Sequence, residues 1–138
     1  MRFLVDTNVL SEMRKGRGGN TGVVAWAGSV DVVDLATSVL CLKELEFGVL
    51  NISHSDPSQS LVLRAYLEHF VVPQYADRIL PIDRAVAVRA AALDVPKRRP
   101  VVDGLIAATA LVHGLTVVTR NTIDFLPTGV RLLNPFTA

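Results

Sequence analysis

The first residues of the chain place a carboxylate at the end of an apolar run. Phe3, Leu4 and Val5 are strand formers, Asp6 follows them directly, and a helix-like stretch begins at Asn8. In an open α/β sheet, ligands bind just outside the carboxyl ends of the strands. The pattern therefore predicts a buried strand, with Asp6 at the edge where such a sheet binds its ligands.

Strand-like and helix-like segments alternate along the rest of the chain. Ser38 and Asp83 are expected to stand at the starts of helices, and Gly114 at the end of one. Pro73 is expected to end the fourth helix, and Pro81 argues against a fully paired central position for the third strand. The alternation predicts an α/β fold with a mostly parallel sheet. Strands are expected at residues 2–5, 32–37, 78–82, 115–119 and 129–133, and helices at residues 8–13, 21–30, 39–50, 59–70, 83–93 and 102–113.

Size and composition indicate one domain that spans residues 1–138. Half of the residues are hydrophobic and the mean hydropathy is +0.39, which is typical of a sheet buried on both faces. The net charge of +1 gives no global electrostatic argument for nucleic acid, and a single cysteine, Cys41, excludes an intrachain disulfide. Because no uninterrupted apolar run approaches the roughly 20 residues of a spanning helix, we expect a cytoplasmic protein without a membrane segment.

Three more acids, Glu44, Asp103 and Asp124, stand at the edges of expected elements, far from Asp6 in the chain. Mg²⁺ and Mn²⁺ prefer oxygen ligands. Carboxylates gathered without a cation would repel one another, which raises their pKa values. Four acids that converge without a cationic side chain would therefore form a site for a hard divalent cation. Such a cation can polarise a phosphoryl oxygen, generate hydroxide and orient a scissile phosphodiester.

Each acid also has a purely structural interpretation. Asp6 could cap the helix that follows it, Asp103 could serve the dipole of the helix it opens, and Asp124 could be a turn residue. The helix around Glu44 is apolar almost all the way round, which predicts burial between layers and a need for a charge partner. Glu46 faces the same constraint, and periodicity does not choose between the two glutamates.

Basic side chains gather in two local clusters. Contacts with phosphates and plain solvated loops are both open interpretations of such clusters. The second cluster lies within a few residues of Asp103, which favours a role in binding. The candidate residues are Arg14, Lys15 and Arg17 early in the chain, Lys97, Arg98 and Arg99 in the middle, and Arg120 near the end.

Four stretches, in order along essentially the whole chain, resemble the PIN domain and, within it, the VapC and FitB type of ribonuclease toxin. They are Leu4–Glu12, Ser38–Val49, Asp103–Ala110 and His113–Phe125, and the ending Gly129–Phe136 also fits. Each stretch alone is a weak signal, whereas four in register are specific. The resemblance implies a three-layer α/β/α fold with a small parallel sheet.

The resemblance also implies a set of site residues. The catalytic and metal-binding acids would be Asp6, Glu44, Asp103 and Asp124. This set selects Glu44 over Glu46. Because some relatives carry an acid at the position of Asn121, the fourth ligand is left open between Asp124, Asn121 and water. Cys41 stands where relatives often have Thr. Supporting polar positions would be Thr7, Asn8, Ser38, Thr119 and Asn121.

A chain with this resemblance is expected to be a Mg²⁺- or Mn²⁺-dependent endoribonuclease that hydrolyses RNA with a metal-activated water. It would act as the toxin of a toxin–antitoxin pair. The expected partners are RNA, a cognate antitoxin, a second copy in a homodimer, and promoter DNA reached only through the antitoxin. The alternative is a PIN-like module that binds RNA or a partner without cutting it.

Other phosphoryl-transfer folds fit the sequence less well. A haloacid-dehalogenase-like phosphatase needs a second aspartate two residues after the first, and the residue two positions after Asp6 is Asn8. No P-loop motif occurs in the chain. DNA stays open as a substrate because carboxylates do not detect a 2′-hydroxyl group.

Overall fold

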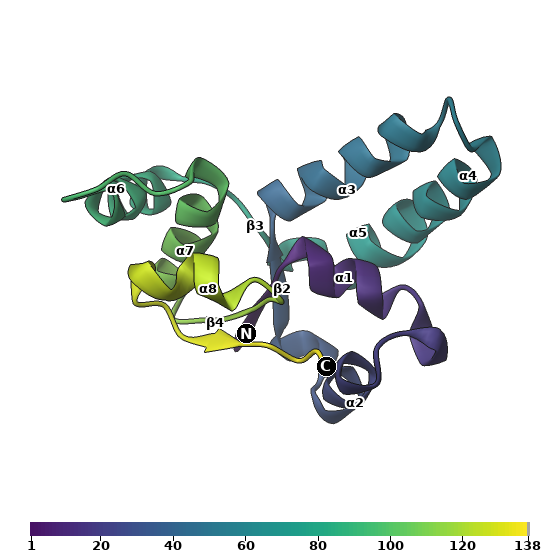
Figure 1. Ribbon diagram of the computed structural model, residues 1–138, viewed down its shortest axis with the longest axis horizontal. Helices are drawn as coiled ribbons and strands as arrows, with labels where there is room; N and C mark the ends of the chain where they lie inside the picture. Colours follow the sequence, from purple (N-terminus) through teal and green to yellow (C-terminus); the bar gives the residue numbers. More distant parts are fainter. Residues whose placement is uncertain (138) are drawn as a thin grey trace.

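A five-stranded parallel sheet forms the centre of the computed structural model, which describes residues 1–137 (Figure 1). The strands follow the order β3-β2-β1-β4-β5, and Phe3 pairs with Leu35 on one side and with Thr116 on the other. Because every pairing is parallel, the carboxyl ends of the strands meet at one edge. The strands are β1 (Phe3–Val5), β2 (Leu35–Ser38), β3 (Ile79–Leu80), β4 (Thr116–Val118) and β5 (Leu132–Leu133).

Helices cover both faces of the sheet, which confirms the three-layer α/β/α architecture (Figure 1). The chain steps outward from β1 to β3 and then returns past β1 to β4, so right-handed crossovers put α1–α5 on one face and α6–α8 on the other. No helix within residues 1–137 is long and apolar enough to cross a bilayer. The helices are α1 (Thr7–Met13), α2 (Thr21–Ser29), α3 (Val39–Ile52), α4 (Pro57–Tyr66), α5 (Val72–Tyr75), α6 (Arg84–Leu93), α7 (Val101–His113) and α8 (Thr122–Phe125).

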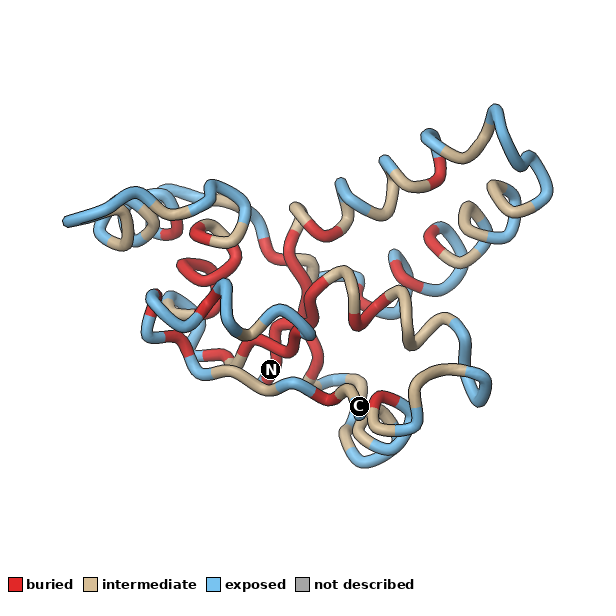
Figure 2. Tube along the Cα trace, in the orientation of Figure 1, coloured by how far each residue is buried: buried red, intermediate tan, exposed pale blue. Residues whose placement is uncertain are grey.

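The core is centred on the middle strands. Leu4 and Val5 of β1 and Val117 and Val118 of β4 have no exposed surface. Figure 2 shows the buried residues concentrated in the strands and in the helical turns that face them. The apolar residues therefore bury both faces of the sheet. The close-packed core fixes the backbone at the carboxyl ends of these strands, where polar side chains follow.

Several local signals act as the sequence predicted. The hydroxyl of Ser38 caps α3 and the carboxylate of Asp83 caps α6, each accepting a hydrogen bond from a first-turn amide. Gly114 ends α7 with a left-handed φ of 67°. β3 lies at the edge of the sheet, where Pro81 allows it. The ends of these elements were therefore readable from local chemistry.

Two boundaries differ from the sequence-based expectation. The second strand begins at Leu35, because Val32–Asp34 forms a 3₁₀ turn in which the Asp34 amide donates to the Asp31 carbonyl. Pro73 does not end the helical path: α4 runs on through a π-helical segment, Leu67–Val71, into α5. Pro73 lies in the first turn of α5, directly after the π-helical segment, where the i to i−4 hydrogen-bond pattern is already interrupted.

The helix α3 is not buried between layers as its composition predicted. Only Cys41 and Val49 of its residues are buried, whereas the side chains of Phe47 and Leu50 are 64% and 57% exposed. Together with α4, this helix forms a hairpin that projects from the body of the molecule (Figure 1). One apolar face of α3 is thus left open in the isolated chain.

Candidate active site at the carboxyl edge of the sheet

Asp6 is held in a fixed orientation directly after β1. Its carboxylate is buried; Oδ1 accepts a hydrogen bond from the Thr7 amide at 2.8 Å, and Oδ2 accepts one from the Thr119 hydroxyl at 2.8 Å. The Asn8 side-chain amide adds a longer bond of 3.4 Å to Oδ2. The bond from Thr7 is the helix cap that the sequence allowed. The Asp6 carboxylate therefore caps α1 and is also held in place by side chains of the candidate site.

Thr119 and Asn8 extend this network from the end of β4. Thr119 is fully buried, and its hydroxyl also accepts hydrogen bonds from the Asn8 side chain at 3.3 Å and from the Asn121 amide at 3.1 Å. The Asn8 carbonyl oxygen accepts a bond of 3.0 Å from the Arg120 amide. The loop after β4 is thereby tied to the first turn of α1, beside Asp6.

Cys41 is a site neighbour that the sequence analysis treated only as a departure. Its buried thiol donates to Oδ1 of Asp6 at a sulfur–oxygen distance of 3.8 Å. Burial, with the nearby charge of Asp6, raises the pKa of this thiol to about 11, which keeps it protonated as a donor. Cys41 and Glu44 are three residues apart on α3 and so share a face, which is the signal that could have identified it.

The other three acids come from three further elements. Glu44 lies on α3, and Asp103 and Asp124 lie in the first turns of α7 and α8. Burial is the main cause that raises the pKa of both Glu44 and Asp103. The negative charges of Asp6 and Asp103 add to the rise at Glu44, and those of Asp124 and Asp6 add to the rise at Asp103. The four acids thus influence one another at a single edge of the sheet.

Glu44 reaches the surface, so the expectation that it is buried between layers was wrong. It lines two hollows beside the edge. One, of about 120 Å³, lies between α1, α3 and α4 and is also lined by Thr7 and Arg14. The other, of about 230 Å³, is bounded by Phe47 and Val102. The buried hydroxyl of Thr7 has no hydrogen-bond partner within residues 1–137.

Glu46, the rival of Glu44, has a structural partner. Its carboxylate accepts two hydrogen bonds from the Arg64 guanidinium, at 2.6 and 2.8 Å, which join α3 to α4. This pair lowers the pKa of Glu46, the opposite direction to Glu44. Two glutamates that periodicity could not separate are thus placed in different environments by the position of α4.

The donor chemistry of the edge fits a hard divalent cation. None of the four acids forms an ion pair with a side chain of the described residues. Their oxygens are of the type that Mg²⁺ and Mn²⁺ prefer as ligands, and a cation would offset the neighbouring negative charges that help to raise the pKa of Glu44 and Asp103. No three acids, histidines or cysteines within residues 1–137 are close enough to form a closed ligand set. The acids of the described residues therefore do not form a preassembled cage for a cation.

The remaining supporting positions have unequal roles. Ser38 is fully buried, and its hydroxyl accepts a hydrogen bond of 3.0 Å from the Leu40 amide as the cap of α3. Asn121 precedes α8 without a capping bond from its side chain and is exposed close to Asp124 in the chain. Ser38 therefore supports the edge through the backbone, whereas the amide of Asn121 is free to face a ligand.

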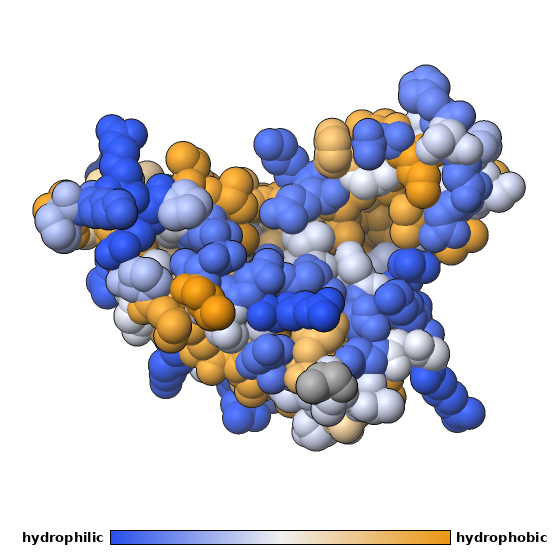
Figure 3. Space-filling view, viewed as in Figure 1, coloured by the Kyte–Doolittle hydropathy of each residue, from blue (hydrophilic) through white to orange (hydrophobic). Residues whose placement is uncertain are grey.

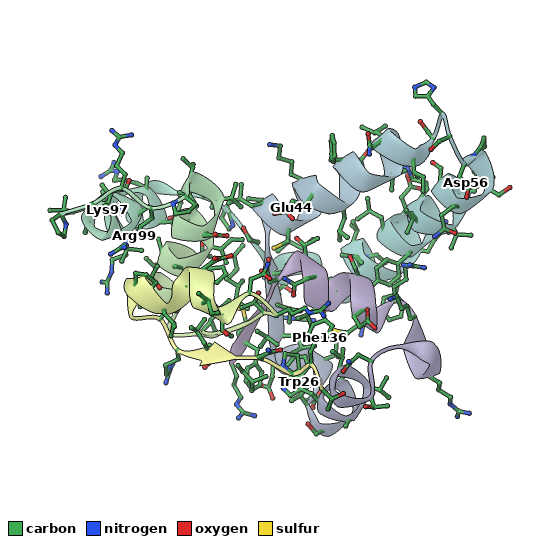
Figure 4. All side chains as sticks on the ribbon, in the orientation of Figure 1. Trp26, Glu44, Asp56, Lys97, Arg99 and Phe136 are labelled. Carbon is green, nitrogen blue, oxygen red and sulfur yellow. The ribbon has the colours of Figure 1, made fainter. Side chains whose placement is uncertain are left out.

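The basic candidates are spread around this edge unevenly. Lys15 forms an ion pair of 2.8 Å with Glu12, and Arg99 donates to the carbonyl oxygens of Leu93 and Pro127. Lys97 lies beyond α6, well apart from Glu44 (Figure 4). The second basic cluster is close to Asp103 in sequence, but this closeness supports a role in phosphate binding less strongly than expected. Arg98 is exposed in the same segment, and Arg17 is exposed in the loop after α1. Arg14 lines the same hollow as Glu44, and the backbone amide of Arg120 donates to the side chain of Asn8.

Comparison with known families settles the relationship of the chain. Residues 3–126 match the family described as the PIN domain. The chain belongs to the PIN-domain family. The matched residues include all four candidate acids, from Asp6 through Asp124.

Individual PIN-domain proteins are similar over almost their whole length. Toxin FitB from Neisseria gonorrhoeae is 38% identical, with 97% of this chain and 98% of FitB covered. VapC ribonuclease Y4jK from Sinorhizobium fredii is 34% identical, with 97% of each chain covered. The crystal structure of FitAcB from Neisseria gonorrhoeae superposes with a TM-score of 0.87 over 96% of this chain and 97% of that chain, at 38% identity. This PIN domain thus shares its fold with the FitAcB structure over 96% of its length.

Proposed function

We propose that this PIN domain is a Mg²⁺- or Mn²⁺-dependent endoribonuclease and the toxin of a toxin–antitoxin pair. The observation that carries the proposal is a set of four acids, Asp6, Glu44, Asp103 and Asp124, none of which has an ion-pair partner within residues 1–137. The reaction class and the RNA substrate follow from relatives that are named as ribonucleases. Toxin FitB, similar over nearly the whole chain, supports the role as a toxin.

Asp6, Glu44 and Asp103 would hold the cation. The fourth position is completed by Asp124, by Asn121 or by water. A bound Mg²⁺ or Mn²⁺ supplies a Lewis acid for the phosphoryl group and lowers the pKa of water so that hydroxide is available for in-line attack. No residue is required to form a covalent intermediate with RNA.

The protein itself supplies orientation and charge balance. Donors from Thr119, Asn8 and Cys41 hold the Asp6 carboxylate in one orientation at the carboxyl end of β1. Cationic side chains at the rim offset the negative charge that the acids present to an incoming RNA phosphate. Arg14 and Arg120 are best placed for this, with Lys97 and Arg98 as outer contacts.

The proposed partners are a cognate antitoxin and a second copy of the chain. Solved relatives include FitAB bound to a DNA fragment, which is 35% identical to this chain, and this supports promoter DNA reached through an antitoxin. The exposed apolar face of α3, with Phe47 and Leu50, provides surface for such partners. Hydrophilic side chains gather over the middle of the face in Figure 3, over α1 and between α1 and α8, where RNA would approach. We place the protein in the cytoplasm.

The test is RNA cleavage by pure protein freed of any bound antitoxin. Structured and unstructured RNAs are incubated with Mg²⁺, Mn²⁺ or EDTA, using the wild type, Asp6→Asn and Asp103→Asn. We expect cleavage that requires metal and is lost in both variants. Cleavage that survives the substitutions would assign the activity to a contaminant and leave the acids as helix caps.

The second candidate function is binding of RNA or a partner without cleavage. The incomplete ligand set within residues 1–137 is the observation that favours it. Fluorescence anisotropy with labelled RNA separates the two functions. Binding without cleavage, in either metal, would support the binding module, whereas metal-dependent cleavage would exclude it.

A further inference from the structure

The last residues of the described chain form a strap over the start of α2. This C-terminal strap is Asn134–Thr137. The Asn20 side chain donates to the Thr137 carbonyl at 2.9 Å and accepts from the Thr137 amide at 2.9 Å. The carbonyl of Pro135 lies so close to Gly22 that a side chain at position 22 would collide with it. The strap is therefore fixed at its end by paired hydrogen bonds and close packing.

The strap carries one aromatic ring, Phe136, which packs partly against the core and lies beside α1 in Figure 4. The Arg120 guanidinium lies over this ring, with its central carbon 5.0 Å from the ring centroid. The backbone of Arg120 is fixed separately, because its amide donates to Asn8 at 3.0 Å. The backbone of Arg120 is thus held by Asn8, and its guanidinium is held by the ring of Phe136.

The stacked position leaves Arg120 able to bind an anion. An aromatic ring occupies one face of a guanidinium, whereas its N–H donors point outward in the plane and can meet a phosphate in bidentate geometry. Arg120 is exposed and forms no ion pair within residues 1–137. It follows directly on Thr119, the donor to Asp6. The backbone of Arg120 thus lies at the carboxyl edge of β4, and its guanidinium is held over Phe136 of the strap.

We propose that Phe136 is a positioning residue that holds Arg120 to receive an RNA phosphate beside the acidic edge. The inference rests on the proposed function for its ligand class. Without the ring, a long arginine side chain samples many rotamers and turns toward Glu12, whose charge already interacts with Arg120. The C-terminal strap thereby contributes to substrate binding, although no strap residue is among the acids.

The experiment measures the affinity of a fluorescein-labelled single-stranded RNA in EDTA, where no cleavage occurs, at several salt concentrations. We expect Phe136→Leu to weaken binding by roughly two- to fivefold, the size of one exposed cation–π contact, and Phe136→Tyr to bind as the wild type does. Arg120→Ala should also reduce the slope of log affinity against log salt by about 0.7, the value for one phosphate contact. In the Arg120→Ala background, Phe136→Leu should change the affinity no further.

Arg131→Ala is the matched control. It removes the same charge at the opposite end of β5, where the guanidinium donates to the Gly114 carbonyl, and the RNA affinity should be unchanged. An equal, additive loss from Phe136→Leu in both backgrounds would overturn the inference, because the strap would then act on folding alone. Loss of affinity in Phe136→Tyr as large as in Phe136→Leu would also overturn it.

The cleavage assay separates this inference from the proposed function. Metal-dependent cleavage with no effect of Phe136→Leu on RNA affinity or on KM would leave the nuclease standing and overturn the positioning role. Arg120- and Phe136-dependent binding without any cleavage would support the positioning role and overturn the nuclease. If the wild type neither binds nor cuts RNA, the proposed nuclease function and the positioning role of Phe136 are both overturned.

Discussion

The buried hydroxyl of Thr119 donates a hydrogen bond of 2.8 Å to Oδ2 of Asp6, across 113 residues of sequence. The bond joins the carboxyl ends of β4 and β1, which are paired in the sheet. Thr119 also accepts from Asn8 and from the Asn121 amide, so one hydroxyl links three segments of the edge. The orientation of Asp6 therefore depends on a residue that carries no charge.

Thr119→Val should reduce RNA cleavage by roughly 10- to 100-fold, the usual cost of removing a donor to a metal-binding carboxylate. Thr119→Ser keeps the hydroxyl and should restore most of the activity. Cleavage rates and Mg²⁺ titrations measure both effects. Thr109→Val is the matched control, since Thr109 is equally buried but donates only to the Leu105 carbonyl within α7. Equal losses from both valine variants would show that buried threonines act through stability alone.

Glu44→Gln and Glu46→Gln should have opposite consequences. Glu44→Gln removes a proposed cation ligand and should abolish cleavage. Glu46→Gln weakens the Arg64 pair between α3 and α4, which should cost about 0.2–1 kcal/mol of unfolding free energy and leave cleavage intact. Urea denaturation and the cleavage assay check the two outcomes. A Glu46→Gln protein that is stable but inactive would show that the acids are assigned wrongly.

Glu44 should destabilise the metal-free protein near neutral pH. Its pKa is raised in the folded state above the ordinary value of 4.5, so the folded protein binds more protons and loses stability as pH rises through that value. In EDTA at pH 7, Glu44→Gln should therefore have a higher Tm than the wild type, and the two should converge near pH 4. Saturating Mg²⁺ should reverse the order at pH 7. A lower Tm for the variant in EDTA would contradict this account.

Cys41 should be inert in the native protein. Its thiol is fully buried and burial raises its pKa to about 11, whereas alkylating reagents react with the exposed thiolate. Iodoacetamide at pH 8 should leave the folded chain unmodified and label it completely in denaturant, as mass spectrometry will show. Because the unfolded thiol ionises near pH 9.0, stability should fall as pH rises from about 9 to 11. Rapid native labelling at pH 8 would refute the buried contact with Asp6.

Gly22→Ala and Gly28→Ala test the packing of the C-terminal strap. Both glycines lie in α2, but a methyl group at Gly22 would meet the Pro135 carbonyl and Thr137, whereas one at Gly28 meets nothing within 4 Å. Gly22→Ala should cost about 1–3 kcal/mol of unfolding free energy, the usual cost of overpacking. Gly28→Ala should stabilise the chain by about 0.4–1 kcal/mol. Urea denaturation compares them, and a neutral Gly22→Ala would mean that the strap is not closely packed.

Local chemistry was enough to predict much of the fold. Ser38 and Asp83 mark helix starts, Gly114 marks a helix end, and Pro81 marks an edge strand, because each acts through its own backbone or its nearest neighbours. Pro73 misled because its effect depends on where the helix begins. The break between α4 and α5 is made by a π-helical segment, which places Pro73 in a first turn.

The candidate acids could be recognised along the chain, but their environments could not. Periodicity left Glu44 and Glu46 equivalent, and only the packing of α4 gave Glu46 its arginine. The thiol of Cys41 was interpreted as a missing hydroxyl, yet the fold turns it toward Asp6 as a donor. Arg99, close to Asp103 in sequence, is engaged with backbone carbonyls of Leu93 and Pro127.

The alternation of strands and helices, the caps and the position of Asp6 after β1 could be predicted, because they follow from propensity and from contacts within a few residues. Folding in three dimensions was needed to establish which charges are neutralised, which acids influence one another and where the Arg120 side chain lies. Those outcomes depend on distances between segments as far apart as Asp6 and Thr119, or Asn20 and Thr137. Burial and Coulomb energy depend on the distances between segments, and the parallel sheet determines those distances.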